Sequence, residues 1–91
     1  MKIRYKARAL GDLQHIHSYI SQFDSVAAKS VIRRIERSIA RLTIVPMSGR
    51  PSLKGTRLLV VPGLPYVVVH RIGDKAIDII AVLHTARRRR S

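Results

Sequence analysis

The chain has 91 residues, 46% of them hydrophobic, and these values favour a single globular domain over a disordered or multidomain protein. It contains no cysteine, which excludes a disulfide framework. Eighteen Lys and Arg residues against five Asp and Glu residues give a formal net charge of +13, which predicts an acidic or polyanionic partner. We treat residues 1–91 as one domain with a basic tail at 87–91.

No segment has the pattern of a targeting or membrane-spanning element. The residues after Met1 alternate charged and apolar side chains and contain no apolar run of the kind that signal peptides carry. The longest apolar stretch, LLVVPGLPYVVV, is short and is interrupted by two prolines. We therefore expect a cytoplasmic protein without membrane contact.

The first half of the chain predicts one strand and two helices. KIRY (Lys2 to Tyr5) alternates polar and apolar residues, as a strand does. From Ala7 to Ser21, apolar residues recur every three or four positions, which predicts an amphipathic helix, although no capping residue marks its start. A second helix is predicted from Asp24 or Ser25, either of which suits an N-cap, to about Leu42. The short link predicts an antiparallel helical hairpin.

The two faces of the second predicted helix differ in chemistry. Its buried stripe is expected to consist of Ala28, Ile32, Ile35, Ile39 and Leu42. Its other face carries Arg33, Arg34, Arg37 and Arg41. Such a face is either solvated or contacts phosphate.

The second half of the chain predicts a loop and then three strands. Two prolines and two glycines in VPMSGRPSLKGT (residues 45–56) predict a loop. RLLVV, YVVVHRI and AIDIIAVL predict strands, with PGLP and GDK as the turns between them. Because the last two runs are apolar on both faces, we expect them in the middle of the sheet. The helical hairpin covers one face, and we expect a partner on the other.

The predicted fold class is therefore α+β, with an N-terminal strand and an antiparallel helical hairpin packed on a small antiparallel sheet. No metal or cofactor site is expected. His15 and His17 are two positions apart on a helix and point to different faces, and the few carboxylates are scattered. The chain also lacks a glycine-rich phosphate-binding loop.

Ribonuclease chemistry without a metal requires proton transfer and cationic stabilisation of the phosphate. Cations are abundant, and they include Arg50, Lys54, Arg57, Arg71 and Arg87. For proton transfer the chain offers His84, expected just past the last strand, and less clearly His70, which faces the opposite side of the sheet from Arg71. His84 either takes part in a site or orders the C-terminus by hydrogen bonding.

The sequence ends in HTARRRRS, whose arginines form an exposed end suited to DNA, RNA or an acidic protein. Aromatic residues make up only 4% of the chain, so stacking on single-stranded bases is not favoured.

Several strings together resemble the ParE branch of the RelE/ParE toxin superfamily. They are ARALGDLQHIHSYI, SGRP, GTRLLVVPGLPYVVVHRI and IIAVLHTARR, in this order and over nearly the whole chain. The resemblance implies a helical hairpin on a small antiparallel sheet. It also implies the toxin of a type II toxin–antitoxin module, neutralised by an acidic, ParD-like antitoxin that covers the apolar surface.

The resemblance implies one of two activities. ParE-like members poison DNA gyrase, whereas RelE-like members cleave mRNA on the ribosome, many with a C-terminal tyrosine or histidine. The terminal tyrosine is absent here, so we expect a gyrase inhibitor that acts by binding rather than by catalysis. The alternative is a metal-independent, ribosome-dependent endoribonuclease that uses His84, Arg57 and Arg71.

The resemblance and the charge pattern together give two sets of expected contact residues, with DNA or the ribosome as alternative partners. The target-binding set is Arg50, Arg57, His84, Arg87, Arg88, Arg89 and Arg90. The antitoxin-binding set is Leu13, His17, Ile20, Arg34, Arg37 and Arg41.

Overall fold

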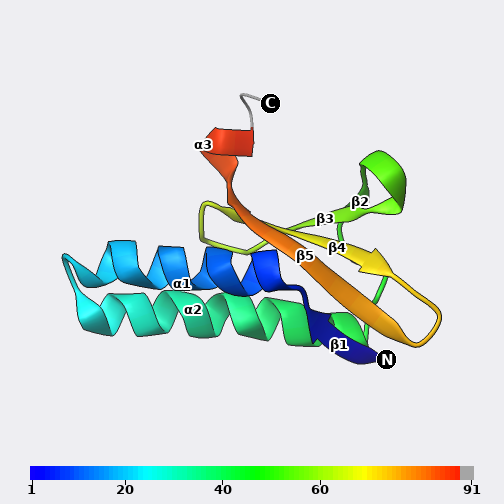
Figure 1. Cartoon of the computed structure of the whole chain (residues 1–91), viewed down its shortest axis with the longest axis horizontal. Helices are drawn as coiled ribbons and strands as arrows, with labels where there is room; N and C mark the ends of the chain where they lie inside the picture. The colour runs from blue at the N-terminus through cyan, green and yellow to red at the C-terminus, as the bar shows by residue number, and fades with distance from the viewer. Residues whose placement is uncertain (89–91) are drawn as a thin grey trace.

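The computed structural model describes residues 1–88 and folds them into two long helices packed on one face of a five-stranded sheet (Figure 1). In chain order the elements are β1 (Lys2–Tyr5), α1 (Ala7–Ser21), α2 (Ser25–Ala40), the short 3₁₀ helix η1 (Arg41–Thr43), β2 (Arg50–Pro51), a second 3₁₀ turn η2 (Leu53–Gly55), β3 (Arg57–Val60), β4 (Tyr66–Ile72), β5 (Ala76–His84) and α3 (Thr85–Arg88).

The helical hairpin is confirmed, and α1 and α2 lie side by side below the sheet in Figure 1. α1 begins at Ala7, and its N-cap residue, Lys6, makes no side-chain capping hydrogen bond, as the sequence predicts. Asp24 caps α2, because its carboxylate accepts hydrogen bonds of 3.0 Å from the backbone N–H groups of Val26 and Ala27. None of the described helices is long and apolar enough to cross a lipid bilayer.

The sheet has the strand order β1-β5-β4-β3-β2, so β4 and β5 lie inside it as predicted. Three details differ from the prediction. β1 pairs with β5 in parallel, so the sheet is only mostly antiparallel. The predicted loop at 45–56 contains β2 and η2. His84 is the last residue of β5 rather than a residue past it, because it pairs with Tyr66 of β4.

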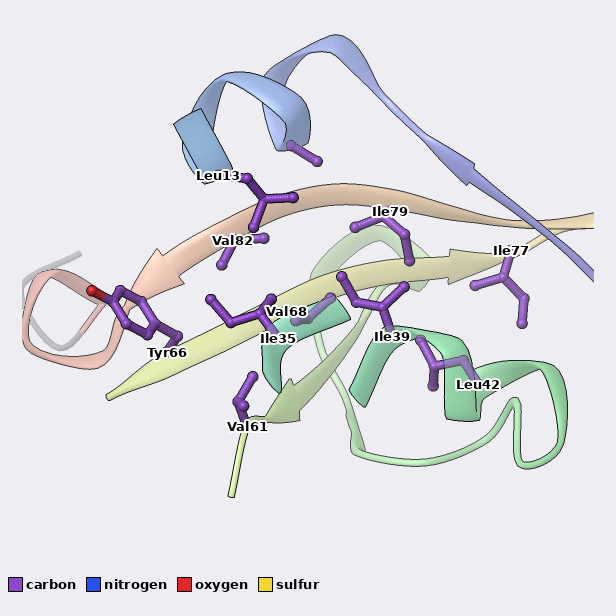
Figure 2. Packing of buried hydrophobic residues seen from close by; sticks show 11 residues of the cluster. Leu13, Ile35, Ile39, Leu42, Val61, Tyr66, Val68, Ile77, Ile79 and Val82 are labelled. Carbon is purple, nitrogen blue, oxygen red and sulfur yellow. The ribbon is translucent and has the colours of Figure 1, made fainter. Parts of the chain in front are cut away.

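The core lies between the helices and one face of the sheet (Figure 2). The predicted stripe of α2 packs there. Ala28, Ile35, Ile39 and Leu42 are fully buried, and Ile32 is half-buried. Val68 of β4 and Ile79 of β5 meet this stripe from the sheet.

Because side chains alternate along a strand, the neighbours of the core-facing residues point away from the helices. We call this side the open face. It carries Leu58, Val60, Val67, Val69, Arg71, Asp78, Ala81 and Leu83. Neither α1 nor α2 covers it, and the side chain of Val60 is 59% exposed there. The partner expected on this face stays a prediction.

Candidate functional site

The open face carries basic groups at its end near the β4–β5 turn. Arg71 donates a hydrogen bond of 3.3 Å to the backbone carbonyl of Lys54 and pairs across the sheet with Asp78. The guanidinium of Arg4 donates to both carboxylate oxygens of Asp78, at 2.8 and 3.3 Å. The hydrogen bond from Arg4 is the largest cause that lowers the pKa of Asp78. Arg50, on β2, is exposed opposite Leu58 of the same face.

Arg57 lies on the other side of the sheet. It pairs with His70 of β4, and its guanidinium donates to the carbonyls of Met47 and Gly49 at 2.8 and 3.0 Å. Its Nε atom is buried without a hydrogen-bond partner among the described residues. These contacts make Arg57 a brace for the loop that precedes β2, and its expected target contact stays a prediction.

Gly49 lets this loop approach β3 closely. Its φ angle is +88°, and a Cβ atom at this position would overlap the backbone carbonyl of Leu58. The SGRP string therefore has a structural reason. Gly49 allows the close approach, the adjacent Arg57 holds the loop carbonyls, and the next residue, Arg50, is presented at the sheet edge.

His70 is completely buried beside Arg57, on the opposite side of the sheet from Arg71, as its strand position predicts. Neither ring nitrogen has a hydrogen-bond partner among the described side chains and backbone groups. Burial is the largest cause that lowers the pKa of His70. The positive charge of Arg57 also lowers it, and the nearby backbone of Pro46 acts against both. His70 is thus an uncharged core residue at neutral pH.

His84 lines a cleft of about 340 Å³ between α1 and the ends of β4 and β5. Its ring packs edge-to-face against Tyr66, with ring centroids 5.5 Å apart. His15 and Tyr19 of α1 line the opposite wall. The Nδ1 atom of His84 accepts a hydrogen bond of 3.1 Å from the backbone N–H of Ala86. His84 therefore orders the start of α3, which is one of the two roles that its sequence position suggested.

Sequence reasoning missed Tyr66 and Asp12 as members of this region. A β-bulge between Val69 and His70 shifts the pairing by one residue and brings Tyr66 opposite His84. Asp12 joins α1 to β5, because its carboxylate accepts a hydrogen bond of 2.9 Å from the backbone N–H of Val82. The sequence does show Tyr66 at the start of a predicted strand, but no sequence pattern marks the bulge that brings it opposite His84.

The structure does not bring the three candidate nuclease residues together. Arg71 points to the open face, whereas Arg57 and His84 lie on the helix side. On that side, Arg57 lies opposite His70 of β4, and His84 lies opposite Tyr66 of the same strand. His70 and Tyr66 are four positions apart, so Arg57 and His84 are separated by roughly 13 Å along the sheet. Of the arginine tail, Arg87 and Arg88 end α3, and Arg89 and Arg90 lie outside the described residues.

The expected antitoxin-binding residues fall into two groups. Leu13 packs in the core and is only 7% exposed, so a partner does not reach it in this conformation. His17 and Ile20 are half-buried on α1. Arg34, Arg37 and Arg41 are exposed along α2, beside the turn between β3 and β4. Among residues 1–88, no three His, Cys, Asp or Glu side chains gather as a metal site would require.

Comparison with known proteins shows the family to which the chain belongs. The family model described as the ParE toxin of the type II toxin–antitoxin system parDE matches residues 3–89. The Sinorhizobium fredii protein Y4kP is 39% identical over 84 residues, which cover 91% of this chain and 86% of that protein. Toxin RelE2 of Caulobacter vibrioides is 37% identical over 81 residues, covering 88% of this chain and 90% of that toxin.

The fold also has a solved counterpart. A chain of the chromosomal ParDE system from P. aeruginosa superposes with a TM-score of 0.83 at 24% identity, over 92% of this chain and 95% of that one. This likeness confirms the α+β architecture of two helices on a mostly antiparallel sheet.

Proposed function

Because the chain belongs to the ParE family of type II toxins, we propose that it inhibits DNA gyrase by binding and is neutralised by a cognate acidic antitoxin. The observation that carries the first half of this proposal is the separation of the candidate nuclease residues. Proton transfer and phosphate stabilisation must act on one phosphodiester at the same time. With Arg71 on one face, and Arg57 and His84 far apart on the other, no single phosphodiester reaches all three.

Charge and a partly exposed apolar surface support the second half, the neutralisation by an antitoxin. Val60, Val69 and Leu83 lie on the open face, where neither long helix covers them. A partner that buries them and contributes acidic residues offsets both the apolar exposure and the +13 charge. The similar P. aeruginosa chain comes from a ParDE toxin–antitoxin system, which fits such a partnership.

Within this proposal, the target contacts come chiefly from the exposed cations. Arg50 and Arg71 lie on the open face, and His84 ends β5 directly before α3, which lies at the opposite end of the sheet from β1 (Figure 1). These groups hold gyrase, or the DNA bound to it, through charge-assisted hydrogen bonds. The brace formed by Arg57 keeps Arg50 in place for this contact.

The second candidate is ribosome-dependent cleavage of mRNA, which the name of the relative Toxin RelE2 brings into consideration. It requires His84 as a proton-transfer group, so His84→Ala abolishes cleavage if this candidate is correct. Parallel assays of plasmid supercoiling by gyrase and of mRNA integrity in a bacterial translation extract separate the two. Loss of supercoiling with intact mRNA supports the proposal. Cleaved mRNA with active gyrase overturns it.

A further inference from the structure

A basic groove separates α2 from the turn between β3 and β4. Two adjoining cavities, of about 180 and about 270 Å³, form it, and both are lined by Ser38, Arg41 and Pro62. Arg37 lines one of them and Val60 the other. One wall of the groove is therefore cationic and belongs to a helix, while the other is apolar and belongs to a strand and its turn.

The arginines of this groove are available to a ligand. Among the side chains of residues 1–86, the ion pairs are Arg4 with Asp78 and Arg8 with Asp12, so the groove arginines have no carboxylate partner there. Arg34, at one end, is fixed by a hydrogen bond of 2.9 Å to the carbonyl of Pro62. Arg37 and Arg41 are exposed farther along the same helix face.

The strand that borders the groove has a free edge. β2 pairs only with Arg57 and Leu58 of β3. The backbone N–H of Val61 donates to the carbonyl of Tyr66 on β4, so the N–H and C=O groups of Val60 point the opposite way, toward the edge. The side chain of Val60 is 59% exposed on the open face. An extended segment laid against this edge would form two backbone hydrogen bonds with Val60.

The opposite edge of the sheet is less suited to such pairing. β5 extends past β1, but the carboxylate of Asp12 already accepts the N–H of Val82 there. An acidic side chain that occupies an edge N–H group blocks an added strand and repels an acidic one. This contrast favours the edge at Val60.

We propose that this groove binds an extended acidic segment of the cognate antitoxin, which adds to the sheet beside Val60. Since side chains alternate along a strand, every second residue points its carboxylate toward Arg37 and Arg41, and the residues between them place apolar side chains next to Val60. A nucleic-acid strand fits less well, because half of the groove is apolar and the chain has few aromatic residues. The inference rests on the proposed neutralisation by an antitoxin.

The test uses fluorescence anisotropy with the full chain and three labelled probes. The first is a short peptide of alternating Glu and Val, the second has the same composition arranged in one Glu block and one Val block, and the third is oligothymidylate. The groove variant is Arg37→Gln with Arg41→Gln. The control variant is Lys29→Gln with Arg33→Gln, which removes equal charge from exposed positions of α2 that do not line the groove.

We expect the alternating peptide to bind best and the groove variant to weaken it about tenfold, with less than about a twofold effect of the control variant. If the groove variant and the control variant lose the same amount of peptide affinity, the binding depends on overall charge, and the proposal is overturned. Tighter, groove-dependent binding of the oligonucleotide overturns it in favour of nucleic acid. If the alternating peptide does not bind but the wild-type chain inhibits gyrase, the groove assignment is wrong and the proposed function stands. If gyrase stays fully active in the presence of the chain, the proposed function itself is refuted.

A second pair of variants tests the strand pairing itself. Val60→Pro removes the edge N–H, and prolines are tolerated at strand edges, whereas Val60→Thr keeps the N–H and the branched side chain. Peptide binding is expected to weaken in the proline variant and to persist in the threonine variant, with circular dichroism confirming that both fold. Equal binding by the two folded variants contradicts the added strand.

Discussion

Gly49 and Gly55 both have positive φ angles, +88° and +73°, but their surroundings differ. A Cβ atom at Gly49 would overlap the carbonyl of Leu58, whereas nothing lies within 4 Å of one at Gly55. We expect Gly49→Ala to lower the free energy of unfolding by roughly 3 kcal/mol, and Gly55→Ala by about 1 kcal/mol through its backbone conformation alone. Urea unfolding of both variants measures the difference. Equal losses would show that the approach to β3 contributes nothing.

The burial of His70 makes the stability of the protein depend on pH. Burial lowers the pKa of His70 below its ordinary value of 6.5, so the folded state binds a proton less readily than the unfolded chain. The contribution of neutral His70 is therefore complete above pH 6.5 and decreases as the pH falls through and below that value. We expect the free energy of unfolding in urea to be steady above about pH 7 and to fall between about pH 7 and about pH 5.

The variant His70→Leu isolates this contribution from the other histidines. Leu fills much of the same space without a titratable group, and the two ring nitrogens that it removes have no hydrogen-bond partner in the described part of the chain. The variant is expected to show a shallower dependence of stability on pH than the wild-type chain. An unchanged slope would assign the pH dependence to other groups.

At the scale of elements, Asp12 connects α1 to the free part of the β5 edge. Asp12→Ala leaves the N–H of Val82 without its acceptor, and we expect a loss of about 1–3 kcal/mol in the free energy of unfolding. Asp12→Asn keeps a carbonyl acceptor and is expected to lose less than about 1 kcal/mol. Chemical denaturation gives both values, and amide hydrogen exchange at Val82 reports the local bond. Slow exchange in the alanine variant would contradict this role.

The elements that the sequence predicts correctly are those with a local cause. α1 and α2 follow the 3.6-residue period of their apolar positions, and Asp24 caps α2 where expected. β4 and β5 are central because both of their faces are apolar. The two-residue strand β2 escaped prediction, since it contains a proline and depends on Gly49 lying against β3.

The face on which a side chain lies was harder to predict. RLLVV is apolar at successive positions, so its pattern does not assign Arg57 to one side of the sheet. The turn after β4 alone would pair Tyr66 with Leu83, and the bulge shifts this partner to His84. The face of Arg57 and the partner of Tyr66 both decide the geometry of the candidate site. That geometry depends on strand register rather than on local periodicity, so the sequence pattern does not predict it.

For the whole molecule, fold and family identify a type II toxin but not its target. Proteins named ParE and RelE are both similar to this chain, so the target depends on surface groups. The arrangement of those groups favours binding, because Arg71 lies on the open face while the candidate proton-transfer group, His84, lies in a cleft on the helix side of the sheet.

The most direct test of gyrase inhibition is to incubate the purified chain with bacterial gyrase, relaxed plasmid and ATP, and to measure both supercoiled product and linear plasmid after detergent and protease treatment. We expect supercoiling to be lost and linear plasmid to accumulate, because the bound toxin stabilises the cleaved gyrase–DNA complex. His84→Ala is expected to retain some inhibition, since the mechanism requires no proton transfer. Undiminished supercoiling without linear plasmid, at toxin in excess over gyrase, would contradict gyrase as the target.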